Sequence, residues 1–130
     1  MTDTHALYWH LTNDPKLSST ARQVFQEADV GLHRIFVPGI ALIEMVYLAE
    51  KGRLDRTWVN QVLDLLEIVG GSYTIAPLDQ RTARALQEVP RSVIPDMPDR
   101  IIVATARQLR MPLITRDTRI CETELVSVVW

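Results

Sequence analysis

The sequence has few of the features that mark disulfide-linked or membrane-spanning proteins. Its single cysteine, Cys121, excludes an internal disulfide framework and any zinc site built from several thiolates. The uncharged apolar stretch at residues 35–43 contains a proline and a glycine and is too short to cross a bilayer. The chain does not open with a basic region followed by an apolar run, so we expect no signal peptide and predict a cytoplasmic location.

The chain also lacks an excess of positive charge. Its 14 basic and 16 acidic residues give a formal net charge of -2, which argues against a surface that binds polyanions generally. Lys16 and Lys51 are the only lysines, so the other basic residues are all arginines. Arginine suits bidentate phosphate contacts, which leaves open a local basic rim around an acidic site. We expect most of the arginines to lie on solvated helix faces.

What the chain does have is the length and composition of one domain, spanning residues 1–130, with 47% apolar residues. Amphipathic segments predict helices over residues 18–31, 40–51, 57–69, 79–89 and 98–110, with a turn or short helix from residue 117. Short apolar segments predict strands at residues 35–37, 73–76, 113–115 and 125–129. The alternation predicts a three-layer α/β/α domain with a parallel sheet of four to five strands, whose ligand site should lie at the carboxyl ends of the strands.

The last long helix is predicted to begin with a carboxylate that faces the core. Asp99 lines up with Ile102, Val103 and Ala106 at helical offsets, so its side chain should point where the apolar stripe points. A carboxylate in that position needs a partner. Asp96 comes three residues earlier, at the position of a helix N-cap, and we predict a structural role for it.

Glu44 is the only charged residue between Arg34 and Glu50, in the middle of an apolar helix. Burying an unpaired carboxylate is costly or forces its protonation. We favour a role in a functional site over the alternative, a salt bridge to a buried arginine.

Asp3 and Asp117 complete a set of four acids. Asp117 follows the predicted strand at residues 113–115, and Asp3 precedes a helix that begins near Thr4. Each has an ordinary alternative as a helix cap. Together, however, Asp3, Asp99 and Asp117 should reach the same edge of the sheet, and Glu44 follows another strand by two helical turns.

Such a cluster would repel itself unless a cation were bound. Mg²⁺ or Mn²⁺ prefers oxygen ligands and can activate water beside a phosphate, so we predict phosphodiester hydrolysis without a covalent enzyme intermediate. Thr4 and Thr115 could hydrogen-bond the acids or metal-bound waters. Three arginines are candidates for phosphate contacts: Arg100, Arg116 and Arg119.

Four segments then resemble the motifs of PIN domains, in particular of the small VapC-type toxin ribonucleases of toxin–antitoxin pairs. The segments are residues 3–9 (DTHALYW), 44–54 (EMVYLAEKGRL), 96–106 (DMPDRIIVATA) and 113–117 (LITRD). They occur in the family's order and are spread over essentially the whole chain.

The resemblance implies a PIN fold, Mg²⁺- or Mn²⁺-dependent endoribonuclease activity and the role of toxin in a type II toxin–antitoxin system. It also implies an RNA substrate, a homodimer and a small antitoxin whose tail blocks the site. The acidic site it implies comprises Asp3, Glu44, Asp99 and Asp117, with the metal held by Asp3, Asp99 and Asp117.

Two departures from the family pattern matter. Relatives have several apolar residues before the first aspartate, whereas only Met1 and Thr2 precede Asp3. We therefore expect either a short central strand or a true start that lies upstream of Met1. Some relatives have a further acid where this chain has Arg119, which favours a single metal ion.

Two alternatives stay open. The short first strand would favour a catalytically inactive PIN-like module that binds RNA or docks a protein. An unrelated receiver-type switch would also contain an acidic pocket, but it would need a reactive lysine beside that pocket.

Overall fold

The computed structural model describes residues 1–130 and contains seven helices and four short strands. The helices are α1 (Thr4–Leu11), α2 (Ser19–Asp29), α3 (Gly39–Glu50), α4 (Arg56–Glu67), α5 (Gln80–Leu86), α6 (Met97–Leu109) and α7 (Thr118–Cys121). The strands are β1 (Ile35–Pro38), β2 (Tyr73–Ala76), β3 (Leu113–Ile114) and β4 (Val128–Val129). None of the helices is both long enough and apolar enough to cross a membrane.

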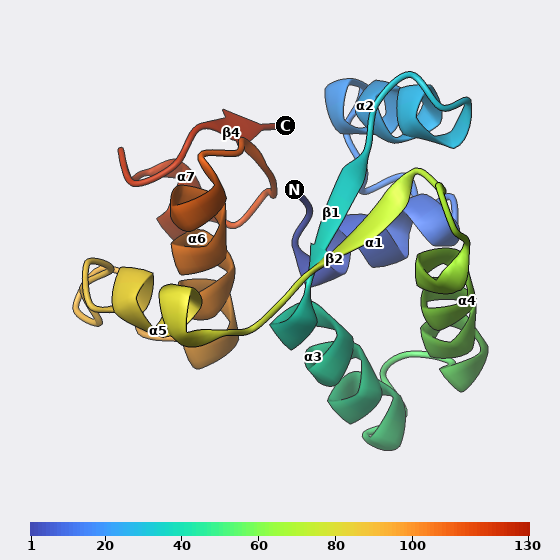
Figure 1. Ribbon diagram of the computed structural model, residues 1–130. Helices are drawn as coiled ribbons and strands as arrows, with labels where there is room; N and C mark the ends of the chain where they lie inside the picture. The colour runs from blue at the N-terminus through green and yellow to red at the C-terminus, as the bar shows by residue number, and fades with distance from the viewer.

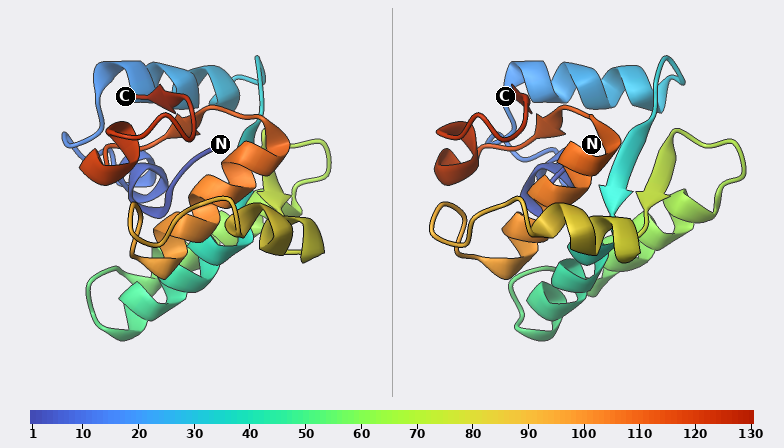
Figure 2. Two further views of the ribbon diagram at one scale, coloured as in Figure 1. Left: turned by 90° about the vertical axis from the view of Figure 1, so that its left-hand side faces the viewer. Right: turned by 60° about the vertical axis from the view of Figure 1, so that its left-hand side comes forward.

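The strands form two parallel pairs, β1 with β2 and β3 with β4. Figure 2 shows β1 and β2 running side by side in the same direction. The N-terminal residues connect the two pairs: the Thr2 amide donates to Phe36 O at 3.0 Å, and the Asp3 amide donates to Ile114 O at 3.1 Å. The resulting order is β2, β1, the N-terminal segment, β3 and β4.

The N-terminal segment therefore takes the place of the central strand. It is as short as predicted, since its only ladder contact is a parallel bridge between Thr2 and Ile114. The row of strands extends from this segment through β1 and β2 on one side, and through β3 and β4 on the other. Strand order reverses beside Asp3, and ligand sites of open α/β sheets form at such a point.

Helices cover both faces of the strands, with α5 and α6 on one side and α1 and α4 on the other (Figure 1). Two hydrophobic clusters fill the two sides. Neighbouring strand residues alternate between them: Ile114 belongs to the cluster that contains Phe25, whereas Leu113 belongs to the cluster that contains Ile102. The predicted three-layer α/β/α arrangement is confirmed.

Most predicted elements are found within two or three residues of their expected bounds, and two are shorter. The helix predicted over residues 79–89 ends at Leu86 and continues as turns to Val89. The last strand was predicted over residues 125–129 and comprises only Val128–Val129. Its partner β3 offers just two residues for pairing, so the ladder cannot extend further.

Candidate active site

All four acids predicted from the sequence line one cavity of about 580 Å³. A fifth carboxylate joins them there. We call this cavity the acidic pocket and define it by these five residues: Asp3, Glu44, Asp96, Asp99 and Asp117.

The fold explains why these residues converge. Asp3 ends the central segment of the sheet, and Asp117 closely follows β3. Asp99 lies in the first turn of α6, and Glu44 lies in α3, the helix that directly follows β1. The two helices α3 and α6 pack against each other (Figure 2). Their acids therefore line the same cavity as Asp3 and Asp117.

Asp3 and Asp117 are both helix caps and pocket residues. Asp3 Oδ1 accepts a hydrogen bond from the Ala6 amide at 2.6 Å, and Asp117 Oδ1 accepts one from the Ile120 amide at 3.0 Å. Thr115 is fully buried between them, and its Oγ1 accepts from the Asp117 amide at 3.1 Å. These bonds fix the orientation of both carboxylates while the pocket remains open to their outer oxygens.

Glu44 is held by Thr4 and forms no salt bridge with an arginine. Thr4 Oγ1 donates to Glu44 Oε2 at 2.6 Å. The expectation that the core encloses Glu44 is wrong, because α3 packs along only part of its surface and leaves Ile43 and Tyr47 more than half exposed. Glu44 is half-buried at the edge of the acidic pocket.

Asp96 is at the N-cap of α6, as predicted, but its side chain makes no capping hydrogen bond. The carboxylate instead lines the acidic pocket, which the sequence analysis missed. A signal was available, since residues three apart at a helix start lie on the same side, and Asp96 is three residues from Asp99.

Asp99 has a strongly perturbed acidity. Burial, followed by the nearby carboxylates of Asp117, Asp96, Glu44 and Asp3 in that order, raises its pKa to about 7. Its side chain has no hydrogen-bond partner that would favour ionisation, whereas Asp3 is bonded by Ala6. Burial also raises the pKa of Asp3, against the opposing effect of its hydrogen bonds.

The chemistry of the pocket suits a hard divalent cation, although no three acidic, histidine or cysteine side chains are arranged as a ready set of ligands. The cap bonds of Asp3 and Asp117 and the Thr4 bond of Glu44 each occupy one carboxylate oxygen. Mg²⁺ is commonly held by one or two carboxylates together with waters and substrate phosphates. A pocket in which five carboxylates meet, and in which four of them raise the pKa of Asp99, fits that kind of binding.

The three arginines predicted to contact phosphate lie in different places. Only Arg116 lines the acidic pocket. Arg100 donates through Nε to Val89 O at 2.7 Å and through Nη2 to Leu86 O at 3.1 Å, so it anchors the end of α5 instead. Arg119 is exposed on α7, outside the pocket lining.

Four further residues line the pocket: His5, Trp9, Lys16 and Thr118. Sequence reasoning gave Trp9 and Lys16 no role here, because nothing in the local pattern places their side chains beside the acids. Lys16 is a lysine beside an acidic pocket, but its Nζ lies 3.8 Å from Asp14 Oδ2 and 6.0 Å from the Trp9 ring centroid. The two groups that the Lys16 ammonium approaches, Asp14 and Trp9, are thus not among the five pocket acids.

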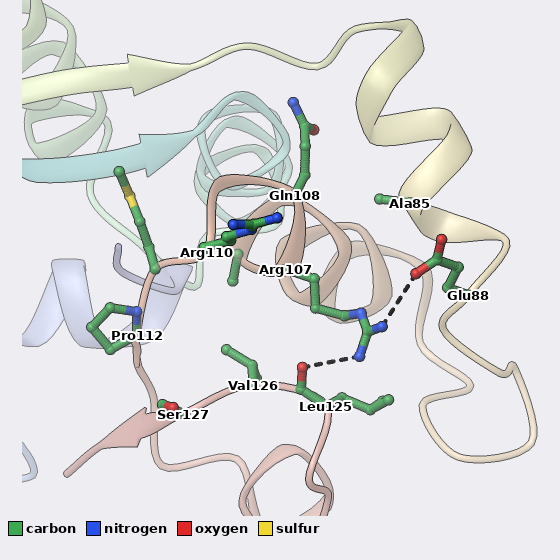
Figure 3. Close-up of a pocket in the computed structure, with 11 residues that line it drawn as sticks. Ala85, Glu88, Arg107, Gln108, Arg110, Pro112, Leu125, Val126 and Ser127 are labelled. Atoms are coloured by element: carbon green, nitrogen blue, oxygen red, sulfur yellow. Dashed lines mark hydrogen bonds and ion pairs between the residues drawn. The ribbon is translucent and has the colours of Figure 1, made fainter.

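A larger cavity, of about 660 Å³, lies elsewhere and contains none of the five pocket acids (Figure 3). It is bounded by α5, the end of α6 and residues 125–127. Arg107 crosses it with hydrogen bonds to Leu125 O at 3.1 Å and Glu88 Oε2 at 3.2 Å (Figure 3). The larger of these two cavities is therefore not the one that the acidic residues line.

Comparison with known proteins gives three matches. The model of the PIN domain family matches residues 1–125. Ribonuclease VapC22 of Mycobacterium tuberculosis is 32% identical over 123 residues, which cover 91% of this chain and 86% of that protein. A crystal structure of VapBC2 from Rickettsia felis, bound to a DNA fragment from their promoter, superposes with a TM-score of 0.72 at 13% identity. That superposition covers 98% of this chain and 95% of the other.

Proposed function

This chain belongs to the PIN domain family, and on that basis we propose that it is a metal-dependent endoribonuclease, the toxin of a type II toxin–antitoxin pair. The observation that carries the proposal is the convergence of Asp3, Glu44, Asp99 and Asp117 on one pocket at the reversal of strand order. The similarity to a ribonuclease over most of both chains supports RNA as the substrate.

In the proposed mechanism, Asp3, Asp99 and Asp117 would hold Mg²⁺ or Mn²⁺. An ion held there would supply an activated water and would neutralise charge on the phosphate. The protein contributes orientation: the Ala6 and Ile120 amides fix the carboxylates of Asp3 and Asp117. Such positioning lowers the entropic cost of bringing water and phosphate together.

Thr4 has a matching role for Glu44. The 2.6 Å hydrogen bond from its hydroxyl holds the Glu44 carboxylate at the pocket edge. Thr115 supports the opposite side, where it contacts both Asp3 and Asp117. Groups that orient ligands in this way commonly change metal affinity or activity by 10- to 100-fold when removed.

We also propose a homodimer and a small antitoxin as partners. A cavity of about 570 Å³ beside the acidic pocket shares Glu44 and Asp96 with it. Ile43, Tyr47 and Met97 line this neighbouring cavity and are more than half exposed. Apolar surface beside the acids suits a protein partner that controls access to them.

An RNA substrate and a lone free cysteine fit action in the cytoplasm.

The short first strand was the reason to consider an inactive module. In the structure, however, this segment is hydrogen-bonded on both sides and brings Asp3 into the pocket. The shortness of this segment therefore leaves the acidic pocket intact, and we favour an active enzyme over an inactive module.

The test is cleavage of RNA by the full chain with Mg²⁺ or Mn²⁺, compared with the Asp99→Asn variant. We expect the variant to lose at least roughly 100-fold in cleavage, given the losses seen when even supporting groups are removed. Far-UV circular dichroism should show an unchanged fold. Asp64→Asn is the matched control, because Asp64 is exposed on α4 and lies outside the acidic pocket. Equal cleavage by the Asp99→Asn variant and the wild type would overturn the proposal.

A further inference from the structure

Trp9 lies at the rim of the acidic pocket among polar and basic side chains. It is on α1, it is half-buried, and it also lines a smaller neighbouring cavity of about 260 Å³. His5, one helical turn earlier, has its ring 5.7 Å away at an interplanar angle of 42°. The Trp130 ring meets Trp9 edge-on at 5.9 Å. The rings of His5 and Trp130 therefore hold the indole in place at the opening of the acidic pocket.

Arg116 lies over this indole, with its Cζ 5.2 Å from the ring centroid. Its guanidinium takes part in no hydrogen bond and no ion pair, although five carboxylates line the same pocket. The face of Trp9 is the only partner that the structure gives it. The guanidinium group is planar, and an exposed arginine that lies over an aromatic ring keeps its hydrogen-bond donors free for a ligand.

We propose that Trp9 and Arg116 form a stacking platform for an unpaired base of the RNA, next to the phosphate that is cleaved. This inference rests on the proposed ribonuclease function. A base can stack on the plane of an aromatic ring or of a guanidinium, but only when it is free of its own helix. The substrate class that fits is therefore single-stranded RNA or the loop of a folded RNA.

Lys16 adds a positive charge on the same rim, 6.0 Å from the Trp9 centroid. It is exposed and lines both the acidic pocket and the smaller cavity. An RNA strand whose base stacks on this platform would thus have the Lys16 ammonium near its sugar-phosphate backbone and the carboxylates near its scissile phosphate. Trp9 and Arg116 act as positioning residues, since neither is placed to take part in bond cleavage.

The first experiment measures steady-state cleavage of a short single-stranded RNA by the wild type, Trp9→Ala and Trp9→Phe. Loss of one stacking contact should raise KM by roughly tenfold in Trp9→Ala, while kcat changes by less than about twofold. Trp9→Phe keeps an aromatic face and should recover most of the loss. Trp58→Phe is the control, because Trp58 is on α4 and lines neither cavity. A tenfold fall in kcat with unchanged KM would contradict a positioning role.

The second experiment varies the RNA as well as the protein. RNAs that carry one abasic nucleotide, moved stepwise across the cut site, are measured for binding by fluorescence anisotropy and for cleavage. The wild type should lose roughly tenfold in affinity at one position only, and Trp9→Ala should be insensitive at that position. Uniform affinity for all abasic RNAs would overturn the platform even if cleavage is robust.

The two proposals fail in different ways. If the wild type binds with the abasic signature but never cleaves RNA, the platform stands and the ribonuclease assignment falls. If Trp9→Ala weakens intact and abasic RNA equally, stacking is excluded and the surface is better suited to an acidic protein segment.

Discussion

Asp3 and Asp117 each perform two tasks, and this limits what their substitution can show. Both cap a helix through one carboxylate oxygen and face the pocket with the side chain as a whole. Loss of a cap costs about 1 kcal/mol of stability, so replacing either residue would mix a folding defect with a chemical one. Asp99 makes no such bond, which makes it the most informative of the acids.

The raised pKa of Asp99 predicts how stability depends on pH in the metal-free protein. Burial, followed by the charges of Asp117, Asp96, Glu44 and Asp3, raises its pKa from 3.8 to about 7. Between pH 4 and 7 the unfolded chain is therefore ionised at Asp99 while the native protein still binds the proton. Stability must fall as pH rises through this window, since the native state binds more protons.

Urea denaturation in the presence of a chelator, at steps from pH 4 to pH 8, measures this effect. Asp99→Asn should abolish a decline on the order of 1–3 kcal/mol, less than the full shift because solvent screens a partly exposed group. The control is Asp64→Asn, which should retain the wild-type slope. Identical pH profiles for wild type and Asp99→Asn would show that the pocket does not raise the pKa of Asp99.

Sequence reasoning identified residues whose position along the backbone decides their role. Asp99 and Asp117 could be predicted because a helix start and a strand end fix where they lie. Trp9 could not be placed, because its role depends on which neighbours surround its side chain in three dimensions. Asp96 could have been placed from its spacing of three residues from Asp99. Arg100 illustrates the same limit: it was expected to contact phosphate, and it binds carbonyls at the end of α5 instead.

At the level of elements, the helices were easier to predict than the strands. The apolar stripe of α4, with Val59 and Val62 buried, defines its inner face over several turns. The two strands β3 and β4 have only two residues each, too few for any pattern to define their ends. Their pairing depends on the N-terminal segment, which the sequence places far away.

The C-terminal end of α6 holds a strained residue that can be improved. Arg110 adopts a left-handed conformation with φ 52° at the C-cap, where glycine is usual. Its exposed side chain makes no hydrogen bond or ion pair. Arg110→Gly should raise stability by roughly 0.5–1 kcal/mol, because relief of a left-handed penalty of about 1–2 kcal/mol exceeds the added chain entropy of about 0.4–1 kcal/mol.

Chemical denaturation of the wild type, Arg110→Gly and Arg110→Ala tests this prediction. Alanine removes the same charge but keeps the Cβ atom that is disfavoured in the left-handed region, so it should give little or no gain. A similar stabilisation in both variants would attribute the effect to charge and not to backbone conformation.

On the scale of the whole molecule, the acidic pocket lies where the two hydrophobic clusters meet. Asp3 comes from the segment between the sheet halves, and Asp99 and Asp117 come from elements whose buried residues, Ile102 and Ile120, belong to one cluster. Glu44 comes from α3, which contributes Met45 to the other cluster. A cation bound among these acids would therefore connect both halves of the core and stabilise the cooperative unit.

Divalent metal should accordingly raise the melting temperature. At a hundredfold excess over Kd, binding to the native state alone adds about 2.7 kcal/mol, which for a chain of this size corresponds to a shift on the order of 10 °C. The gain has two sources, the metal–oxygen bonds themselves and the relief of repulsion among acids that raise the pKa of Asp99. Because binding requires ionised carboxylates, the shift should shrink as pH is lowered below 7.

Differential scanning calorimetry with MgCl₂ or MnCl₂ is the measurement, with NaCl at equal ionic strength as the control for general screening. Asp99→Asn should reduce the metal-dependent shift while it raises the melting temperature of the metal-free protein, because the same substitution removes both a ligand and a repulsive charge. These opposite signs in one variant distinguish a shared metal site from simple charge repulsion. Equal shifts for NaCl and MgCl₂ in the wild type would mean that the five acids do not bind a cation specifically.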